Sequence, residues 1–485
     1  MAQDTLAARQ EHDQQVPVGP PHRRRLSVVH RLLKGWAQLA VAIIYRRVDV
    51  VQTAGAAADG PAILAVNHTN ALGDPVIILA KTPGFPRFLA AASWWKFAPA
   101  RWLFGLAGVL PVHRRRDGDT QQNSSSFHAC HDALARGARI SIHPEGEMHQ
   151  GPALLPIRTG AARIALSAVV DAGVHDLTIV PHALVYADRA RFRSAAAVNV
   201  GAPIPVHEWT DRYRADPEAA VRGLTDAIAE GMAAVATTYP SVDGARVVDR
   251  AAALAVADSP DPAARTFGVQ HALARALGNA VLVAGGESSC RFRELEAAIA
   301  KHDDDLRSIG LTRVGAQPRL ESPLPAARRR NALELATLTP VAAAGLVTNL
   351  PVALTIAGAG RLVRSEGWKA TVNGVLGSAL LPIAWTLETI WACRRLGRRR
   401  GIGVALIGPI GGWALLAWHA RWLRWRRDSW RDAMETSQPG AMAAARASRA
   451  IVKELVEQLV EHPATSMTRP AVLVATPLQL SELSV

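Results

Sequence analysis

The sequence predicts an α/β domain with a mixed central sheet flanked by helices, followed by a helical and membrane-associated C-terminal region. Three observations lead to this prediction. Short β-rich runs alternate with helix-length segments between Pro61 and about Ile204. Three long apolar stretches follow Leu335, and the chain is strongly basic. At roughly 150 residues per domain, a chain of 485 residues has room for about three structural units.

The charge balance and composition narrow the class of partner. Lys and Arg number 55 against 41 Asp and Glu, which gives a formal net charge of +14. This positive net charge predicts an acidic partner, which could be nucleic acid, a phosphate-bearing substrate or an anionic lipid surface. The 13 Trp outnumber the 8 Phe and 4 Tyr, which favours membrane association. Cys130, Cys290 and Cys393 form no C-x-x-C motif, which excludes a disulfide framework and favours a reducing compartment.

The N-terminal part divides into a tail and a helix. Residues 1–22 are polar, lack the apolar segment of a secretory signal and are predicted to be disordered. In residues 23–47, basic side chains bracket an apolar run, as in a helix that lies at a membrane interface. The alternative is an amphipathic helix that packs on the following domain.

The α/β domain is expected over residues 48–210. Its strands are predicted at 62–66, 88–91, 139–143, 177–185 and 197–200. Residues 211–330 are rich in Ala, Arg and Asp with helical spacing and contain no recognisable motif. We expect them to form a helical connection.

Residues 331–430 are predicted to be hydrophobic membrane-associated segments. The stretches 335–360, 368–393 and 401–420 each reach the length needed to span a bilayer. Arginine clusters follow the second and third stretches, and eight of the 13 Trp lie between Trp368 and Trp430. If both arginine clusters stay in the cytoplasm, at least one apolar segment must enter the membrane and return on the same side. Residues Gly408 to Gly412 could break the helix where the chain turns back. A buried soluble bundle is the alternative. Residues 431–485 should form a C-terminal helix and tail.

A histidine and an aspartate follow the first predicted strand of the domain. His68 lies on the loop after this strand, and Asp74 opens the next helix. A carboxylate that accepts from one ring N–H fixes the tautomer, so that the other nitrogen takes a proton from a substrate hydroxyl. Asp74 is alternatively an N-cap, with Pro75 at the first helical position.

Three further segments follow in order. Residues 108–114 end on Arg114, residues 140–147 end a strand on a turn with Glu145 and Gly146, and residues 178–186 form a buried strand. Arg158 lies between the second and third of these segments. A base, two guanidiniums and a turn of backbone N–H groups at strand ends suit a phosphate-bearing acceptor.

These four segments, within residues 45–205, resemble the four ordered blocks of the glycerolipid acyltransferase family. By this resemblance His68 is the general base and Asp74 orients it. The five residues between them resemble the branch with fungal-type glycerol-3-phosphate and dihydroxyacetone-phosphate acyltransferases and large bacterial relatives. The resemblance implies that Arg114, Glu145, Gly146 and Arg158 bind substrate, with Arg158 in place of a phosphate-binding Lys.

The resemblance also implies the reaction and the partners. An acyl group passes from acyl-CoA or acyl carrier protein to a hydroxyl of glycerol 3-phosphate, dihydroxyacetone phosphate or lysophosphatidate. No cofactor is expected beyond the acyl-donor substrate. Membrane lipids are expected partners, nucleic acid is not, and the active site should face the cytoplasm.

Two other functions remain open from the residues alone. One is a metal-dependent hydrolase, for which ligands could come from His128, His131, Asp132, His143, Glu145 and His149, although their spacing matches no known ligand motif. The other is a non-catalytic membrane scaffold or channel built on the C-terminal apolar stretches.

Overall fold

The computed structural model describes residues 27–53, 60–112, 123–149, 151, 153–189, 191–236, 239–310, 320, 325–363 and 366–461. The predicted disordered tail, residues 1–22, and Arg114 lie outside this part of the chain.

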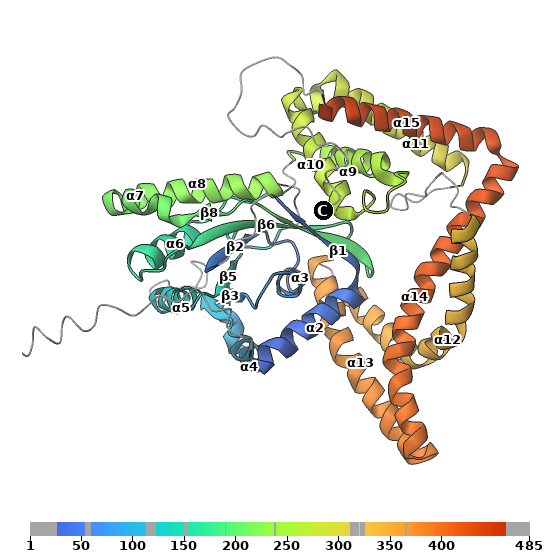
Figure 1. Ribbon diagram of the computed structural model, residues 1–485, viewed down its shortest axis with the longest axis horizontal. Coiled ribbons are helices and arrows are strands. Elements are labelled where there is room, and N and C mark those ends of the chain that lie inside the picture. Colours follow the sequence, from blue (N-terminus) through green and yellow to red (C-terminus); the bar gives the residue numbers. More distant parts are fainter. Residues whose placement is uncertain are drawn as a thin grey trace, which may run out of the picture.

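An eight-stranded mixed sheet forms the centre of the N-terminal half (Figure 1). Its strands are β1 (Tyr45–Gln52), β2 (Ala62–Val66), β3 (Arg87–Ala91), β4 (Leu110–Val112), β5 (Arg139–Ile142), β6 (Thr178–Tyr186), β7 (Ser194–Val200) and β8 (Ile204–Pro205). The order across the sheet is β1-β7-β6-β2-β5-β3-β4, with β8 paired to β6. Neighbours are parallel except that β7 and β8 run antiparallel to β6. The prediction of a mixed sheet is confirmed.

Helices cover both faces of this sheet. They are α2 (Val28–Ile44), α3 (Gly73–Lys81), α4 (Ala98–Ala107), α5 (Asn123–Ala135), α6 (Gly160–Val170), α7 (Thr210–Ala215) and α8 (Pro217–Val235), with short 3₁₀ turns at Ala92–Lys96 and Val206–Trp209. Alternate side chains of β2 point to opposite faces, as expected for a strand. Ile63 and Ala65 pack with α5, α6 and α8, whereas Leu64 and Val66 pack with α2 and α3. Every residue of β2 is buried.

Two boundaries at the N-terminal end of the domain differ from the prediction. The helix predicted over residues 23–47 ends at Ile44, and Tyr45 begins an edge strand that the sequence analysis missed. Arg193, which immediately precedes β7 and has a positive φ of 62°, caps the C-terminal end of α2. Its backbone N–H donates to the Ile44 carbonyl at 2.7 Å, and its guanidinium donates to the Ala42 and Tyr45 carbonyls.

The segment expected to be a helical connection folds with the C-terminus into one helical unit. Its helices are α9 (Val242–Ala257), α10 (Phe267–Val283), α11 (Cys290–Ser308) and α15 (Pro439–Glu461), with a 3₁₀ turn at Gly286–Ser288. Val452, Val456 and Leu459 of α15 are buried among the apolar faces of α9, α10 and α11. Helix α10 joins this unit to the sheet, because the Gly268 N–H donates to Asp49 of β1 at 2.9 Å.

Three long helices make up the remaining region: α12 (Pro325–Leu362), α13 (Glu366–Leu396) and α14 (Arg398–Ser437). All three contain segments long and apolar enough to cross a membrane by length and composition. Helix α14 continues through Gly408 to Gly412 with Pro409 inside it. The expected break is therefore wrong, since the flanking turns keep their helical hydrogen bonds and the chain does not reverse there.

Candidate active site

The loop that follows β2 lies at the carboxyl edge of the parallel strands, where the loop after β5 meets it. Asn67 fixes the start of this loop, because its side-chain amide donates to the Leu184 carbonyl at 3.0 Å and accepts from the Leu184 N–H at 2.7 Å. Both bonds are buried. The sequence thereby anchors the loop to β6 before the chain reaches His68.

His68 and Asp74 form a hydrogen-bonded pair. His68 Nδ1 lies 3.0 Å from Asp74 Oδ2, which also accepts the Thr69 and Asn70 backbone N–H groups at 2.8 Å each. Asp74 is fully buried, and the His68 side chain is 17% exposed. The carboxylate therefore binds one ring nitrogen of His68 and fixes the orientation of the imidazole.

Tyr186, at the end of β6, holds the second carboxylate oxygen of Asp74. Its hydroxyl donates to Asp74 Oδ1 at 2.5 Å. Burial and the neighbouring carboxylate raise the pKa of the Tyr186 phenol well above its usual value, so this hydroxyl keeps its proton. The ring of Tyr45 lies 5.9 Å from that of Tyr186. The sequence analysis did not assign this role, because the two partners are 112 residues apart.

Glu145 ties the loop after β5 to the His68 loop. Its Oε1 accepts the His68 backbone N–H at 3.0 Å, and its Oε2 accepts the Leu155 N–H at 2.8 Å. His149 Nε2 lies 2.5 Å from the same Oε2. The Glu145 carboxylate is buried, and both of its oxygens contact groups of the protein itself.

His143 stacks on His68. The two ring centroids are 4.1 Å apart with 17° between the planes, and His143 Nδ1 lies 3.0 Å from the Val66 carbonyl. Burial and the nearby His68 lower the pKa of His143 to about 4. His143 is therefore neutral at pH 7, and its ring packs flat against the ring of His68.

Gly146 and Arg158 meet at the Pro-Glu-Gly turn. Gly146 has a φ of 77°, and a Cβ there would lie 2.5 Å from Arg158 Nε, so a larger residue would displace the guanidinium. Arg158 Nε donates to the Glu145 carbonyl at 3.1 Å, and the side chain is 63% exposed. The structure thus brings Arg158 to the turn, where its partly exposed guanidinium also lies 3.9 Å from Glu147 Oε1.

A cavity of about 230 Å³ adjoins the loop that carries His68. Thr69 and His149 line it together with apolar side chains such as Leu154 and Leu184, and so do the charged side chains of Arg189, Arg246 and Asp249. Val242 and Ala245 of α9 line it as well. The helical unit therefore forms part of the wall, a contribution that no sequence motif indicated.

The side chains considered as metal ligands engage different partners. His128 bonds to the Ser124 carbonyl of its own helix, and His131 bonds to Ser167 of α6. His143 and Glu145 instead contact the His68 loop. Within the described residues, no three His, Cys, Asp or Glu side chains are placed to hold a metal ion.

Sheet and site together define an α/β domain with a hydrogen-bonded histidine–aspartate pair, of which the aspartate is buried, at the carboxyl edge of its parallel strands. Residues 47–185 match the family model described as Acyltransferase, so this part of the chain is similar to that family. The resemblance inferred from the four sequence blocks is confirmed for this part of the chain.

The curated relatives include the fungal proteins that the branch assignment anticipated. The chain is 33% identical over 130 residues to glycerol-3-phosphate O-acyltransferase 2 of Saccharomyces cerevisiae, covering 27% of this chain and 18% of that protein. Glycerol-3-phosphate O-acyltransferase 1 of the same yeast is 33% identical over 129 residues, 26% of this chain and 17% of that protein. An uncharacterized acyltransferase of Schizosaccharomyces pombe is 30% identical over 117 residues, 24% and 17% of the two chains. The chain thus spans less than a fifth of the length of these relatives.

Among solved structures, a 1-acyl-sn-glycerophosphate (LPA) acyltransferase from Thermotoga maritima is similar to 42% of this chain and 78% of its own. The identity is 14% and the TM-score is 0.31.

Proposed function

We propose that the protein is an O-acyltransferase that moves a fatty acyl group from acyl-CoA or acyl carrier protein to a hydroxyl of a glycerol-phosphate-type acceptor. The observation that carries this proposal is the His68–Asp74 pair, 3.0 Å apart, inside the segment that matches the acyltransferase family. The names of the yeast relatives support glycerol 3-phosphate as the first acceptor to test.

In this mechanism the free ring nitrogen of His68 takes the proton of the acceptor hydroxyl. The acceptor oxygen then attacks the thioester carbonyl, the new ester C–O bond forms, and the C–S bond breaks. The departing thiolate receives the proton from His68, which returns the imidazole to its neutral form. Asp74 holds the tautomer and stabilises the transient imidazolium, as expected for a buried carboxylate beside a general base.

The other site residues take roles consistent with their contacts. Arg158, at the turn with an exposed guanidinium, is proposed to bind the acceptor phosphate, and Arg114 is proposed to do the same from outside the described residues. Glu145 is proposed to act by positioning, since its oxygens bind the His68 and Leu155 N–H groups. Gly146 leaves room for Arg158.

The acyl chain is proposed to lie against the apolar wall of the cavity beside Thr69, and the site is proposed to face the cytoplasmic leaflet. A product with a long acyl chain would otherwise expose its methylene groups to water, at about 0.8 kcal/mol each. The exposed apolar side chains of α2, Leu32 at 69% and Leu39 at 60%, support contact of the catalytic domain with a lipid surface.

The test is an assay of the purified full chain with labelled acyl-CoA or acyl carrier protein against glycerol 3-phosphate, dihydroxyacetone phosphate and lysophosphatidate. We expect acyl transfer to at least one acceptor, and we expect His68→Ala to lower kcat by at least ~10²-fold. His128→Ala is the matched control, because His128 is exposed and bonds within its own helix. No transfer with either donor would overturn the proposal and favour a scaffold, whereas a fully active His68→Ala variant would refute the role of His68 as the general base.

A further inference from the structure

The three long helices meet at one buried polar residue. Asn349 of α12 is 8% exposed. Its amide donates to the Gly408 carbonyl of α14 at 3.1 Å, and its Oδ1 accepts the Trp385 indole N–H of α13 at 3.0 Å. A Cβ on Gly345 would lie 2.0 Å from the Gly411 carbonyl oxygen, so the backbones of α12 and α14 touch next to Asn349. We call this meeting point the node.

Each helix changes its partner at the node. Before it, α12 runs antiparallel to α14, as the bonds of Asn331 to the Arg421 carbonyl and of Trp418 to Thr339 show. After it, α12 lies along α13, where a Cβ on Gly377 would be 3.5 Å from Ile356.

Beyond the node, α13 in turn lies along α14, because a Cβ on Gly401 would meet Cys393. The three helices therefore form three two-helix arms. The domain arm joins 325–349 with 408–437, the inner arm joins 349–362 with 366–385, and the distal arm joins 385–396 with 398–408. Figure 1 shows the domain arm running to the helical unit and the distal arm at the lower end of the picture.

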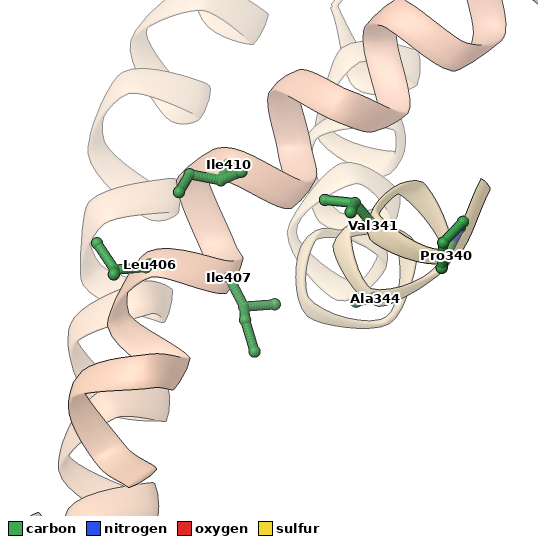
Figure 2. A pocket seen from close by; sticks show the side chains of 6 residues that line it. All are labelled: Pro340, Val341, Ala344, Leu406, Ile407 and Ile410. Carbon is green, nitrogen blue, oxygen red and sulfur yellow. The ribbon is translucent and has the colours of Figure 1, made fainter. Parts of the chain in front are cut away.

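All three arms expose large apolar side chains. Val347 is 76% exposed, Leu354 63%, Leu387 61%, Trp391 60% and Trp413 66%. A cavity of about 320 Å³, lined only by apolar residues such as Val341 and Ile407, opens between α12 and α14 next to the node (Figure 2). An exposed apolar surface of this extent indicates a membrane or protein contact site. The apolar cavity between α12 and α14 suits the acyl chains of lipids.

Arginines lie at the ends of the arms. The distal tip carries five of them, Arg394, Arg395, Arg398, Arg399 and Arg400, and the sequence contains no Asp or Glu between Glu388 and Asp428. The inner arm ends near Arg361, and the apolar part of the domain arm ends at Arg421. At 1.5 Å per residue, the node is about 15 Å from Arg398 and about 20 Å from Arg421 along α14. The two parts of this continuous helix together measure about 35 Å, enough to cross a hydrocarbon core of about 30 Å, so the positions of the arginines decide whether α14 crosses.

The inner arm returns towards the catalytic domain. A Cβ on Gly374 would lie 3.1 Å from Cδ1 of Ile44, at the end of α2. If α14 crossed the bilayer, the five arginines of the distal tip, two on α13 and three on α14, would lie on the face opposite the catalytic domain, against the bias that keeps Arg and Lys in the cytoplasm. With all three arms in one leaflet, every arginine cluster reaches headgroups on the side of the domain.

We propose that α12, α13 and α14 form a monotopic platform in one leaflet of an anionic phospholipid membrane. The node lies among the acyl chains, the arginine tips lie among the headgroups, and no helix crosses the bilayer. Arginine at the interface is attracted to anionic lipid headgroups, whereas its burial at the bilayer centre is costly. This inference does not depend on catalysis.

The test measures on which side of the membrane two thiols react. Cys290 is exposed at the start of α11 in the helical unit and reports the side of the domain. In a Cys393→Ala background, Arg399→Cys adds a thiol at the distal tip. The full chain is labelled with a membrane-impermeant maleimide in sealed vesicles of known orientation.

We expect positions 290 and 399 to react in cytoplasm-outward vesicles and to be protected in the opposite orientation. Labelling of the two positions from opposite sides would show that α14 crosses and would overturn the proposal. Arg395→Cys, on the other helix of the same tip, gives the same readout if Arg399→Cys does not accumulate. Labelling after detergent lysis confirms that each thiol is reactive in the folded chain.

Discussion

The hydroxyl of Tyr186 gives a sharp test of how the buried carboxylate is held. Tyr186→Phe removes the 2.5 Å bond to Asp74 Oδ1 and leaves the ring in place. Because a hydrogen bond to a charged, buried group contributes about 1.5–3 kcal/mol, we expect the domain to lose about that much stability. For a domain of about 200 residues this corresponds to a fall in Tm of roughly 3 to 12 °C.

The same variant should change the rate less than it changes the stability. His68 Nδ1 and two backbone N–H groups still bind Oδ2, so the orientation of the imidazole is retained. We expect kcat for acyl transfer to fall about 3- to 10-fold, which is about 0.7–1.4 kcal/mol of barrier. Asp74→Asn, which removes the charge itself, should lower kcat by ~10²-fold or more.

Thermal unfolding and steady-state kinetics of the full chain are measured side by side. Tyr213→Phe is the matched control, since Tyr213 packs on the other face of the sheet from the helix that carries Asp74. A Tyr186→Phe variant equal to wild type in both Tm and kcat would refute the role given to the hydroxyl.

Three further predictions concern the acceptor, acid stability and the membrane. Arg158→Gln should raise the KM for a phosphate-bearing acceptor about tenfold while Arg158→Lys is partly tolerated, and a raised KM for the acyl donor alone would contradict this. His143 binds fewer protons in the folded chain because its pKa is about 4 against 6.5 unfolded, so its share of stability, about 3 kcal/mol, is complete above pH 6.5 and is lost as the pH falls towards 4. His143→Phe should therefore make the urea unfolding midpoint depend less on pH between pH 4.5 and pH 7.5. A variant with the same pH dependence as the wild type would contradict the contribution assigned to His143. The full chain should resist a high-salt wash of membranes and require detergent for release, whereas recovery in the soluble fraction would mean that the apolar arms pack as a soluble bundle.

The fold was most predictable where a strand is buried on both faces, because burial then requires apolar residues at every position. β2 is buried on both faces, so its apolar run gave the strand with its bounds, Ala62–Val66. β1 was missed because Arg46, Arg47 and Asp49 resemble a solvated surface, although the strand pairs with β7 along its whole length. An edge strand with one covered face carries too few apolar residues to stand out.

The site was predictable where its parts are close in sequence. His68 and Asp74 are six residues apart, and a loop between a strand and a helix brings them together. Tyr186 reaches Asp74 only because β6 pairs with β2, in the register Val66 to His182. Likewise α15 completes the helical unit from more than 130 residues away. Such pairings depend on the whole fold, and no local pattern encodes them.

The long apolar helices are connected to the candidate active site by direct packing. The inner arm contacts Ile44 at the end of α2, and the next residue, Tyr45, is buried beside Tyr186. Tyr186 donates to Asp74, which holds His68. Because buried contacts of this kind resist deformation, we infer that they hold His68 at a fixed distance from the lipid surface. In the proposed reaction, the acceptor hydroxyl would then meet His68 at a fixed depth relative to the membrane surface. Helix α2, which ends at Ile44 against the inner arm, would set this depth.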